Sequence, residues 1–157
     1  MRDDLLHYED IEVGVTARYG QYTLTREEVI AFAEKYDPQD FHLDDAAASR
    51  GPFGKLAASG WNTAAIAMRL LADHVIMRQA AMGGAGVDDL RWTRPVYPGD
   101  VLTLELTVTE KRRSRSRPEM GIVKLSQRLL NQRDEEVLRL NSNGMVRVRH
   151  PEAPILE

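Results

Sequence analysis

The feature that most constrains the fold is a change in the spacing of the apolar residues, from a helical period to an alternating one. From about Trp61 to Ala81, apolar residues recur at helical spacing and lie on almost every side of the helix. Such a helix has to be covered, so we expect a sheet to bury it on most of its sides. From Val101 to Glu110, apolar residues alternate with Thr and Glu, which predicts a half-buried antiparallel strand. The main apolar stripe of the helix consists of Ala64, Ala65, Met68, Leu71 and Val75.

The rest of the chain completes an α+β pattern. Met82–Gly86 is rich in glycine and is expected to be a flexible connection, and a bulge is expected at Asn143–Gly144. One long helix wrapped by a curved antiparallel sheet is the hot-dog arrangement, which is the predicted fold. The predicted elements are strands at 15–23, 87–93, 101–110, 121–130 and 136–149, helices at 25–36, 43–50 and 61–81, and turns at 94–100 and 111–119.

Composition limits the class of protein. The chain has 157 residues, of which 43% are hydrophobic and 29% charged, as in an ordinary globular domain. We expect one domain over 1–157, with residues 1–7 and 151–157 at its periphery. The formal net charge of −3 does not favour nucleic-acid binding. The absence of cysteine excludes disulfides, thiolate metal sites and a cysteine nucleophile.

The beginning of the sequence and its hydrophobic runs bear on localisation. The first residues are too charged for a signal peptide, and no apolar run is long enough to span a bilayer. We therefore expect a cytoplasmic protein that does not associate with a membrane.

Residues Tyr36–His42 form the candidate reactive segment. Thr25 and Glu28 have the spacing of a capping box at the start of a helix, and Pro38 ends that helix. Asp37 and His42 could then divide the acid and base roles of one reaction. The alternative is a polar loop that merely ends a helix.

The neighbouring carboxylates could suggest a metal site, because Asp40, Asp44 and Asp45 surround His42 in the sequence. Catalytic zinc sites usually take two or three histidines, however, and only one is present locally. We expect no metal, and we expect Asp44 or Asp45 to cap the short helix that follows.

Two motifs together resemble the MaoC-like hydratase/dehydratase family, which includes the (R)-specific enoyl-CoA hydratases. The first is Asp37-x-x-x-x-His42, with Asp44 two residues later, and Gly60 after a loop of small residues. The second is Arg94-Pro-Val-x-x-Gly-Asp100. The resemblance extends from about residue 8 to residue 149, and the two motifs are specific only in combination.

The resemblance implies a hot-dog fold, a homodimer joined edge to edge through its sheets, possibly assembled further, and an acyl-CoA substrate. Asp37 and His42 would be the catalytic pair, and the backbone N–H of Gly60 would polarise the thioester carbonyl. The implied reaction is the reversible hydration of a 2-enoyl-CoA to a 3-hydroxyacyl-CoA, with coenzyme A present only as part of the substrate and no other cofactor. We favour Asp37 as the base and His42 as the residue that positions water and delivers the proton, but the sequence leaves their order open.

The chain departs from the family pattern at three places. Gln39 and Asp40 stand where the family usually has Asn and Pro. Ser59 replaces the usual His before the glycine, and Met68 stands where some hydratases place a Ser. These departures concern the subfamily and the acyl group of the substrate.

Several further residues are candidates for substrate binding. Gln39 could hold Asp37 or the substrate, or lie on the surface; Ser59 adjoins Gly60; and Trp61 could line the acyl site or pack under the loop. Arg112, in the basic segment 111–117, could bind the phosphates of coenzyme A or belong to a solvated hairpin. The competing phosphate ligands are Lys55 and Arg50.

Two other functions remain open from the sequence. Hot-dog acyl-CoA thioesterases place their acid on the central helix, whereas residues 63–71 contain no Asp or Glu and Asp73 comes late. A non-catalytic acyl-CoA-binding protein would use Asp37 and His42 only as polar loop residues. Fold alone does not separate these functions.

Overall fold

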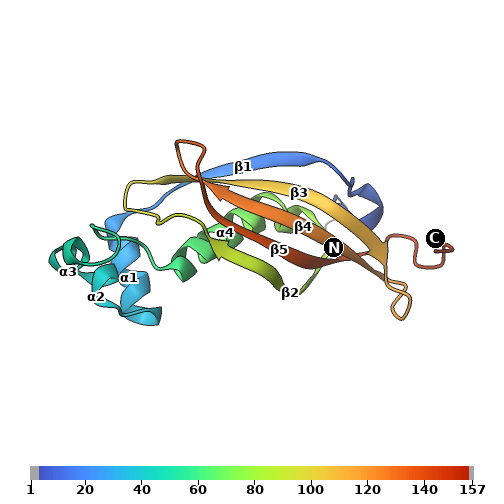
Figure 1. Ribbon diagram of the computed structural model, residues 1–157. Coiled ribbons are helices and arrows are strands. Elements are labelled where there is room, and N and C mark those ends of the chain that lie inside the picture. Colours follow the sequence, from blue (N-terminus) through green and yellow to red (C-terminus); the bar gives the residue numbers. More distant parts are fainter. Residues whose placement is uncertain (1–3, 156–157) are drawn as a thin grey trace.

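The computed structural model describes residues 4–155 and has one long helix lying against a single curved sheet (Figure 1). Residues 1–3 and 156–157, which belong to the segments expected at the periphery, lie outside the described residues. The elements in chain order are η1 (Tyr8–Asp10), β1 (Thr16–Thr23), α1 (Arg26–Tyr36), α2 (Asp40–Leu43), α3 (Asp45–Arg50), α4 (Gly60–His74), η2 (Ile76–Arg78), β2 (Ala81–Trp92), β3 (Val101–Arg113), β4 (Met120–Leu130) and β5 (Glu136–Arg147).

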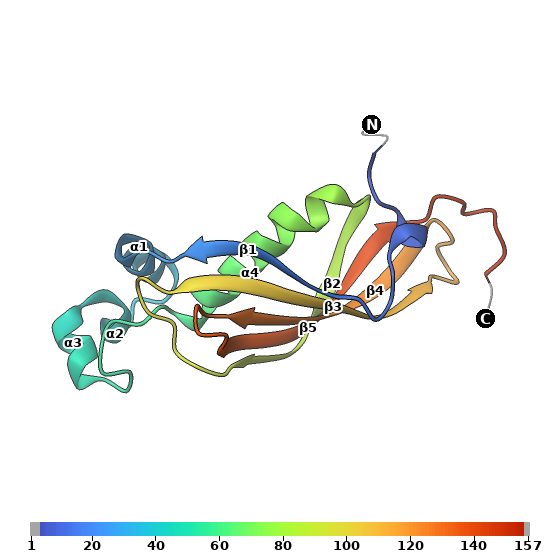
Figure 2. The ribbon, with the colours of Figure 1, turned by 90° about the horizontal axis from the view of Figure 1, so that it is seen from above.

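The sheet is antiparallel, with the strand order β1-β3-β4-β5-β2. It curves around α4, as seen from above in Figure 2, while α1, α2 and α3 gather beyond one end of the sheet. This arrangement confirms the predicted α+β hot-dog fold. No helix among residues 4–155 is both long and apolar enough to cross a membrane.

The core forms where α4 meets the concave face of the sheet. The alternation predicted for β3 is observed, because Leu102, Leu104 and Leu106 are buried. Ile66 and Leu70 of α4 are buried in the same cluster. Burying each of these side chains contributes about 1.5–3 kcal/mol, so the fit of α4 against the sheet accounts for much of the stability of the fold.

The central helix is shorter than predicted. It ends at His74 instead of Ala81, and Met82–Gly86 is part of β2 instead of a flexible connection. Glycine-rich segments are typical of loops, but here the backbone pairs with β5, with Gly84 opposite Gly144. The register shift expected at Asn143–Gly144 occurs between these two strands, and the extra residue lies on β2, between Gly84 and Gly86.

The helix is also less enclosed than predicted. Its buried residues are Asn62, Thr63, Ile66, Ala67, Leu70 and Leu71, which form one face. Ala65 and Met68, which we placed on the main apolar stripe, are exposed, Met68 by 52%. The sheet of one chain therefore covers one side of α4 and leaves apolar surface on the other.

Two further segments differ from the prediction. The strand β3 continues to Arg113, into the segment that we expected to be a turn. The polar segment after α1 contains the short helix α2, which periodicity could not reveal because it has only four residues. Thr25 caps α1 and Asp44 caps α3, as predicted, although the Glu28 carboxylate accepts a hydrogen bond from Tyr22 instead of closing the capping box.

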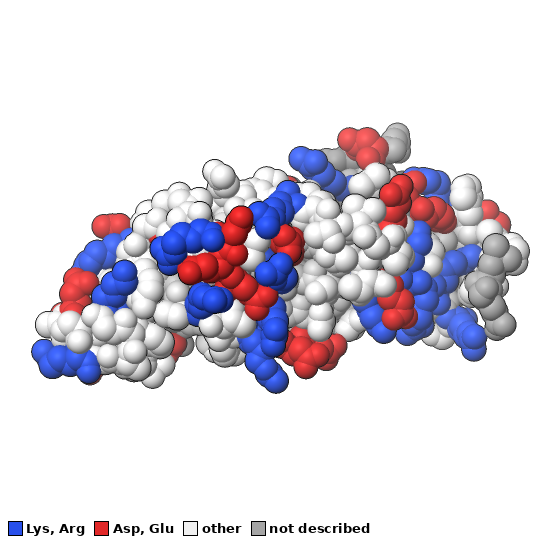
Figure 3. Space-filling model, turned by 45° about the horizontal axis from the view of Figure 1, so that its top comes forward, with Lys and Arg blue, Asp and Glu red and all other residues white. Residues whose placement is uncertain are grey.

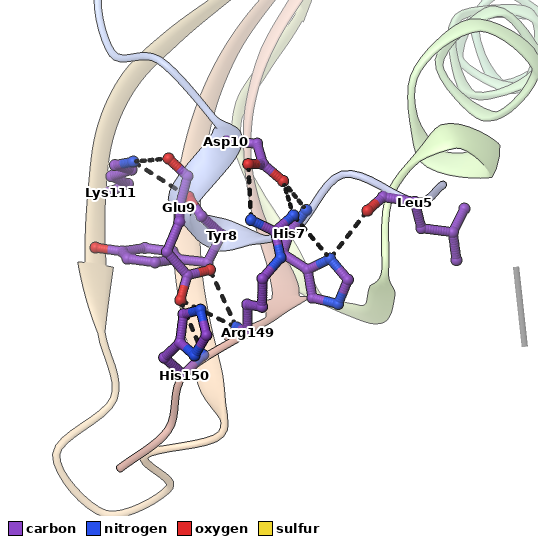
Figure 4. A network of polar contacts seen from close by, with 8 residues as sticks. All are labelled: Leu5, His7, Tyr8, Glu9, Asp10, Lys111, Arg149 and His150. Carbon is purple, nitrogen blue, oxygen red and sulfur yellow. Dashed lines mark hydrogen bonds and ion pairs between the residues drawn. The ribbon is translucent and has the colours of Figure 1, made fainter. Parts of the chain in front are cut away.

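A network of polar contacts joins the N-terminal segment to Lys111 and to the segment that follows β5 (Figure 4). The Lys111 ammonium donates to the carbonyl oxygens of Tyr8 and Ile11 at 3.1 and 2.6 Å. The Glu9 carboxylate accepts from the backbone N–H groups of Arg149 and His150. Lys111 is therefore engaged in holding the N-terminal segment.

The convex face of the sheet carries charges of both signs side by side (Figure 3). Glu105 accepts from Arg18 and Arg128 on the neighbouring strands, at 2.9 and 2.7 Å, and Arg128 also pairs with Glu136. Exposed pairs of this kind are each worth about 0–1 kcal/mol. This polar face is consistent with a sheet that buries only its concave side.

The closest approach of α4 to β1 provides a test of the packing. Gly20 has a φ of +64°, and a Cβ added there would lie 2.6 Å from Leu70 Cδ2. We predict that Gly20→Ala lowers the free energy of unfolding by about 2–5 kcal/mol, through left-handed backbone strain and overpacking.

The matched control is Gly14→Ala, because Gly14 has a φ of +87° but nothing lies within 4 Å of its added Cβ. Its expected cost is about 1–2 kcal/mol, from backbone strain alone. Denaturant unfolding of both variants measures the difference. Equal losses would contradict the close packing of α4 on β1.

Candidate active site

The candidate site is a pocket of about 420 Å³ where α1, α2, α4 and the end of β2 come together. It contains both members of the predicted pair and the predicted backbone donor. The lining residues are Asp37, Gln39, Phe41, His42, Phe53, Ala58, Gly60, Trp61, Thr63, Trp92, Thr93, Arg94, Pro95 and Val96.

Asp37 and His42 face each other in this pocket. Asp37 directly follows α1, where Pro38 ends the helix, and His42 lies on α2 with only 4% of its surface exposed. His42 Nε2 lies 3.5 Å from Asp37 Oδ2, which is longer than an ordinary hydrogen bond. Both atoms can therefore contact one small group that is bound beside them in the pocket.

The hydrogen bond made by Nδ1 of His42 determines the tautomer of the ring. Nδ1 lies 2.7 Å from the carbonyl oxygen of Ala57. Because a carbonyl oxygen only accepts hydrogen bonds, Nδ1 carries a proton and donates it. Nε2, which faces Asp37, is therefore the nitrogen that can gain or lose a proton.

Two side chains hold the carboxylate of Asp37. The hydroxyl of Ser59, which is fully buried, donates to Asp37 Oδ2 at 2.7 Å, and the amide of Gln39 donates to Oδ1 at 2.7 Å. Donors to a carboxylate favour its ionised form. The Ser59 hydrogen bond is the main cause of the lowered pKa of Asp37; the Gln39 hydrogen bond and the nearby His42 add to it, while partial burial opposes it.

Gly60 is the first residue of α4, and Ser59 caps the helix by accepting from the N–H of Trp61 at 3.3 Å. Among the described residues, the Gly60 N–H has no hydrogen-bond partner. The indole Nε1 of Trp92 donates to the Gly60 carbonyl oxygen at 2.7 Å. A free N–H at the positive end of a helix can receive a developing negative charge.

Aromatic rings make up much of the remaining wall. Phe41 packs edge-on against His42 with 4.6 Å between ring centroids, and Phe53 stacks on His42 at 6.1 Å. Trp61 and Trp92 form a T-shaped pair at 5.1 Å and are 58% and 46% exposed. The pocket therefore joins a polar pair to an apolar wall.

Sequence reasoning missed most of the other lining residues, and three of them show why. Thr63 lies one turn after Gly60, so helical spacing could have identified it. Arg94 belongs to the motif that we noted, but nothing in the local sequence directs it to the pocket. Trp92 comes from β2, and only the tertiary structure brings it to Gly60.

None of the three candidate phosphate ligands, Arg112, Lys55 and Arg50, lines the pocket. Lys55 lies near it, with its ammonium 4.1 Å from the ring centroid of Tyr97. Arg112 lies near the C-terminal end of β3, opposite Ile122. The pocket lies at the other end of this strand, where Val96 precedes it. Periodicity places a residue on a strand but does not tell which end of the sheet carries the site.

The other carboxylates of the segment are used locally. Asp44 caps α3, and Asp45 pairs with Arg26. Among residues 4–155, no group of three or more His, Asp or Glu side chains is arranged to hold a metal ion.

The role of Ser59 can be tested directly. In Ser59→Ala the main donor to Asp37 is lost, so the pKa of Asp37 should rise toward the ordinary carboxyl value. Gln39→Ala removes the weaker contribution and should raise this pKa by less. NMR titration of the Asp37 side-chain carboxyl carbon measures both, and an unchanged pKa in Ser59→Ala would contradict the assignment.

Comparison with known proteins finds a matching family model and several similar proteins. The MaoC-like domain matches residues 11–128. A MaoC-like dehydratase of known structure from Rhodospirillum rubrum is 41% identical, with a TM-score of 0.83 over 92% of this chain and 98% of that one. An unliganded (R)-hydratase from Pseudomonas aeruginosa is 27% identical, with a TM-score of 0.71 over 96% of this chain and 95% of that one. A 3-hydroxybutyryl-CoA dehydratase from Methylorubrum extorquens is 31% identical over 108 residues, 68% of this chain and 66% of that protein.

Proposed function

The chain belongs to the MaoC-like dehydratase family, and from this premise we propose that it catalyses the reversible hydration of a 2-enoyl-CoA to a 3-hydroxyacyl-CoA. The observation that carries the proposal is the position of the Asp37–His42 pair, 3.5 Å apart, in the same pocket as the free N–H of Gly60. The relatives named as a dehydratase of 3-hydroxybutyryl-CoA and as an (R)-hydratase support this class of reaction.

Hydration places three demands on the site. A water molecule must lose a proton as its oxygen bonds to C3 of the enoyl group. The electrons of the C2–C3 double bond move toward the thioester, whose oxygen becomes negative. A proton must then reach C2. The proposed reaction transfers no electrons to or from a redox partner, so the proposal requires no redox cofactor.

The proton roles follow from the state of the pair. Asp37 is held ionised by Ser59 and Gln39, so in the hydration direction it acts as the base that takes a proton from water. The protonated Nε2 of His42 is the acid that supplies C2. Dehydration uses the same two side chains in reverse.

The thioester oxygen would lie at the N-terminus of α4. There the Gly60 N–H would donate to it as the enolate forms, and the partial positive charge at the end of a helix adds to this stabilisation. Loss of one such donor typically raises the barrier by ~2.7–4 kcal/mol. The aromatic wall formed by Phe41, Phe53, Trp61 and Trp92 suits the apolar acyl chain.

The alternative of a thioesterase has less support. The face of α4 that lines the pocket contributes Gly60, Trp61 and Thr63 and no carboxylate. Asp73, which comes late in α4, is paired with Arg69 at 2.6 Å. A hydrolase that relies on an acid of the central helix would lack it at this site.

The catalytic pair can be tested by substitution. We predict that Asp37→Asn and His42→Asn each lower kcat/KM for a 2-enoyl-CoA by about 10²–10⁴-fold. Asn at position 42 retains a donor for the Ala57 carbonyl oxygen. Loss of the enoyl-thioester absorbance, with crotonyl-CoA and longer and branched substrates, measures the rate.

Asp40→Asn is the matched control, because Asp40 is an exposed carboxylate of the same segment that does not line the pocket. It should retain wild-type turnover. Full activity in Asp37→Asn would refute the assignment of the pair. Thiol release by the wild type without hydration would indicate a thioesterase, and binding of acyl-CoA without either reaction would indicate a binding protein.

We further propose that two copies join through β2. This strand is a free edge of the sheet, and an unpaired edge is a template for another strand. Val87 on β2 is 55% exposed, and Met68 on α4 is also exposed. Both residues line one apolar cavity of about 670 Å³. A second copy would cover this surface.

Light scattering should therefore give a mass of at least two chains for the wild type. Val87→Lys, which places a charge on the edge strand, should shift the protein toward the monomer. Val13→Lys is the control, because Val13 is 49% exposed but lies outside β2. Equal masses for the two variants would argue against pairing through β2.

A further inference from the structure

Trp92 makes a contact that its position on the strand does not require. It is the last residue of β2, and its indole Nε1–H leaves the sheet to donate to the carbonyl oxygen of Gly60 at 2.7 Å. Its side chain is exposed at the pocket mouth, and the residue as a whole is 46% accessible. Burial in the core therefore does not explain the placement of this large ring.

The ring also fixes Gly60 sterically. A Cβ added to Gly60 would lie 2.5 Å from Trp92 Cε2 and 2.7 Å from its Nε1. The indole thus occupies the space that any side chain at position 60 would need. Glycine at this position is required by the approach of Trp92, which lets the indole reach the backbone itself.

Two hydrogen bonds therefore fix the first turn of α4. Ser59 Oγ accepts one from the N–H of Trp61, and the indole Nε1–H of Trp92 donates the other to the carbonyl oxygen of Gly60. Both bonds act on the peptide that links residues 60 and 61. With this peptide fixed, the neighbouring N–H of Gly60, which has no partner in the described chain, is held in one orientation at a residue that lines the pocket.

We propose that Trp92 is a positioning residue, which holds the Gly60 backbone in the orientation needed to receive the thioester oxyanion. The inference rests on the proposed hydratase function. It assigns to the edge strand β2 a part in catalysis that none of the sequence motifs contains. A donor fixed before the reaction stabilises developing charge without having to reorient.

Trp61 provides the matched control. It lies against Trp92 in the same T-shaped pair and is 58% exposed. Its side chain makes no hydrogen bond to Gly60 among the described contacts. Replacing either tryptophan by phenylalanine keeps an aromatic wall, but only Trp92→Phe removes the donor to Gly60.

The first measurement is steady-state hydration of a 2-enoyl-CoA. For Trp92→Phe we expect kcat to fall by about 3- to 10-fold, the effect of losing one hydrogen bond of ordinary net strength. Both tryptophans line the pocket, so each Trp→Phe variant can change KM. For Trp61→Phe we expect kcat to stay near the wild-type value, because its side chain makes no hydrogen bond to Gly60. Circular dichroism melting should show both variants folded.

The second measurement is independent of activity. The chain has two tryptophans, so a ¹⁵N-labelled sample gives two indole N–H signals in NMR. The Trp92 signal should exchange slowly with solvent and the Trp61 signal quickly. The backbone amide signal of Gly60 should shift and exchange faster in Trp92→Phe, and change little in Trp61→Phe.

The outcomes separate this inference from the proposed function. If the wild type hydrates the substrate but Trp92→Phe retains its kcat, the positioning role is overturned and the hydratase stands. If the wild type hydrates no enoyl-CoA, the proposed function fails, and with it the catalytic meaning of the contact. A Gly60 amide that is unaffected by Trp92→Phe would overturn the structural part as well.

Discussion

The rest of the site depends on the hydroxyl of one buried serine. Ser59 donates to the carboxylate of Asp37 and accepts from the first turn of α4. A helix cap contributes about 1 kcal/mol, and a hydrogen bond to a charged group about 1.5–3 kcal/mol. Because one oxygen makes both bonds, the position of Asp37 is tied to the start of the helix that presents Gly60. The proposed base and the proposed oxyanion donor are therefore parts of one rigid unit.

This unit lies where three helices and the end of one strand meet. The helices α1 and α2 bring Asp37 and His42, α4 brings Gly60, and the end of β2 brings Trp92. Each side chain is held by a second group, as His42 is by the carbonyl of Ala57. The helices α1, α2 and α3 gather beyond the end of the sheet, and the buried side chains of Val29 and Ala48 attach them to the central core.

The exposed apolar face of α4 and the unpaired edge of β2 have the same structural cause. The sheet has five strands and wraps only one side of α4, so an apolar helix face and the edge of β2 are both left open in one chain. Trp92, on the same edge strand, holds Gly60. In the proposed dimer, the strand that joins the two copies would also be the one that supports the site.

The sequence by itself determined the order of the strands and of the longer helices, the alternation of β3, and the grouping of Asp37 and His42 in one segment, because spacing along the chain and caps act over a few residues; Gly60 was indicated by the family resemblance. It misplaced the end of α4 and the role of Met82–Gly86, since glycines in a strand are recognisable only from the partner that pairs with them. Only the tertiary structure brought Trp92 to Gly60 and Ser59 to Asp37 and placed Arg112 away from the pocket. The physical reason is that these relations are set by strand pairing and by the packing of α4 against the sheet, which join residues far apart in the chain.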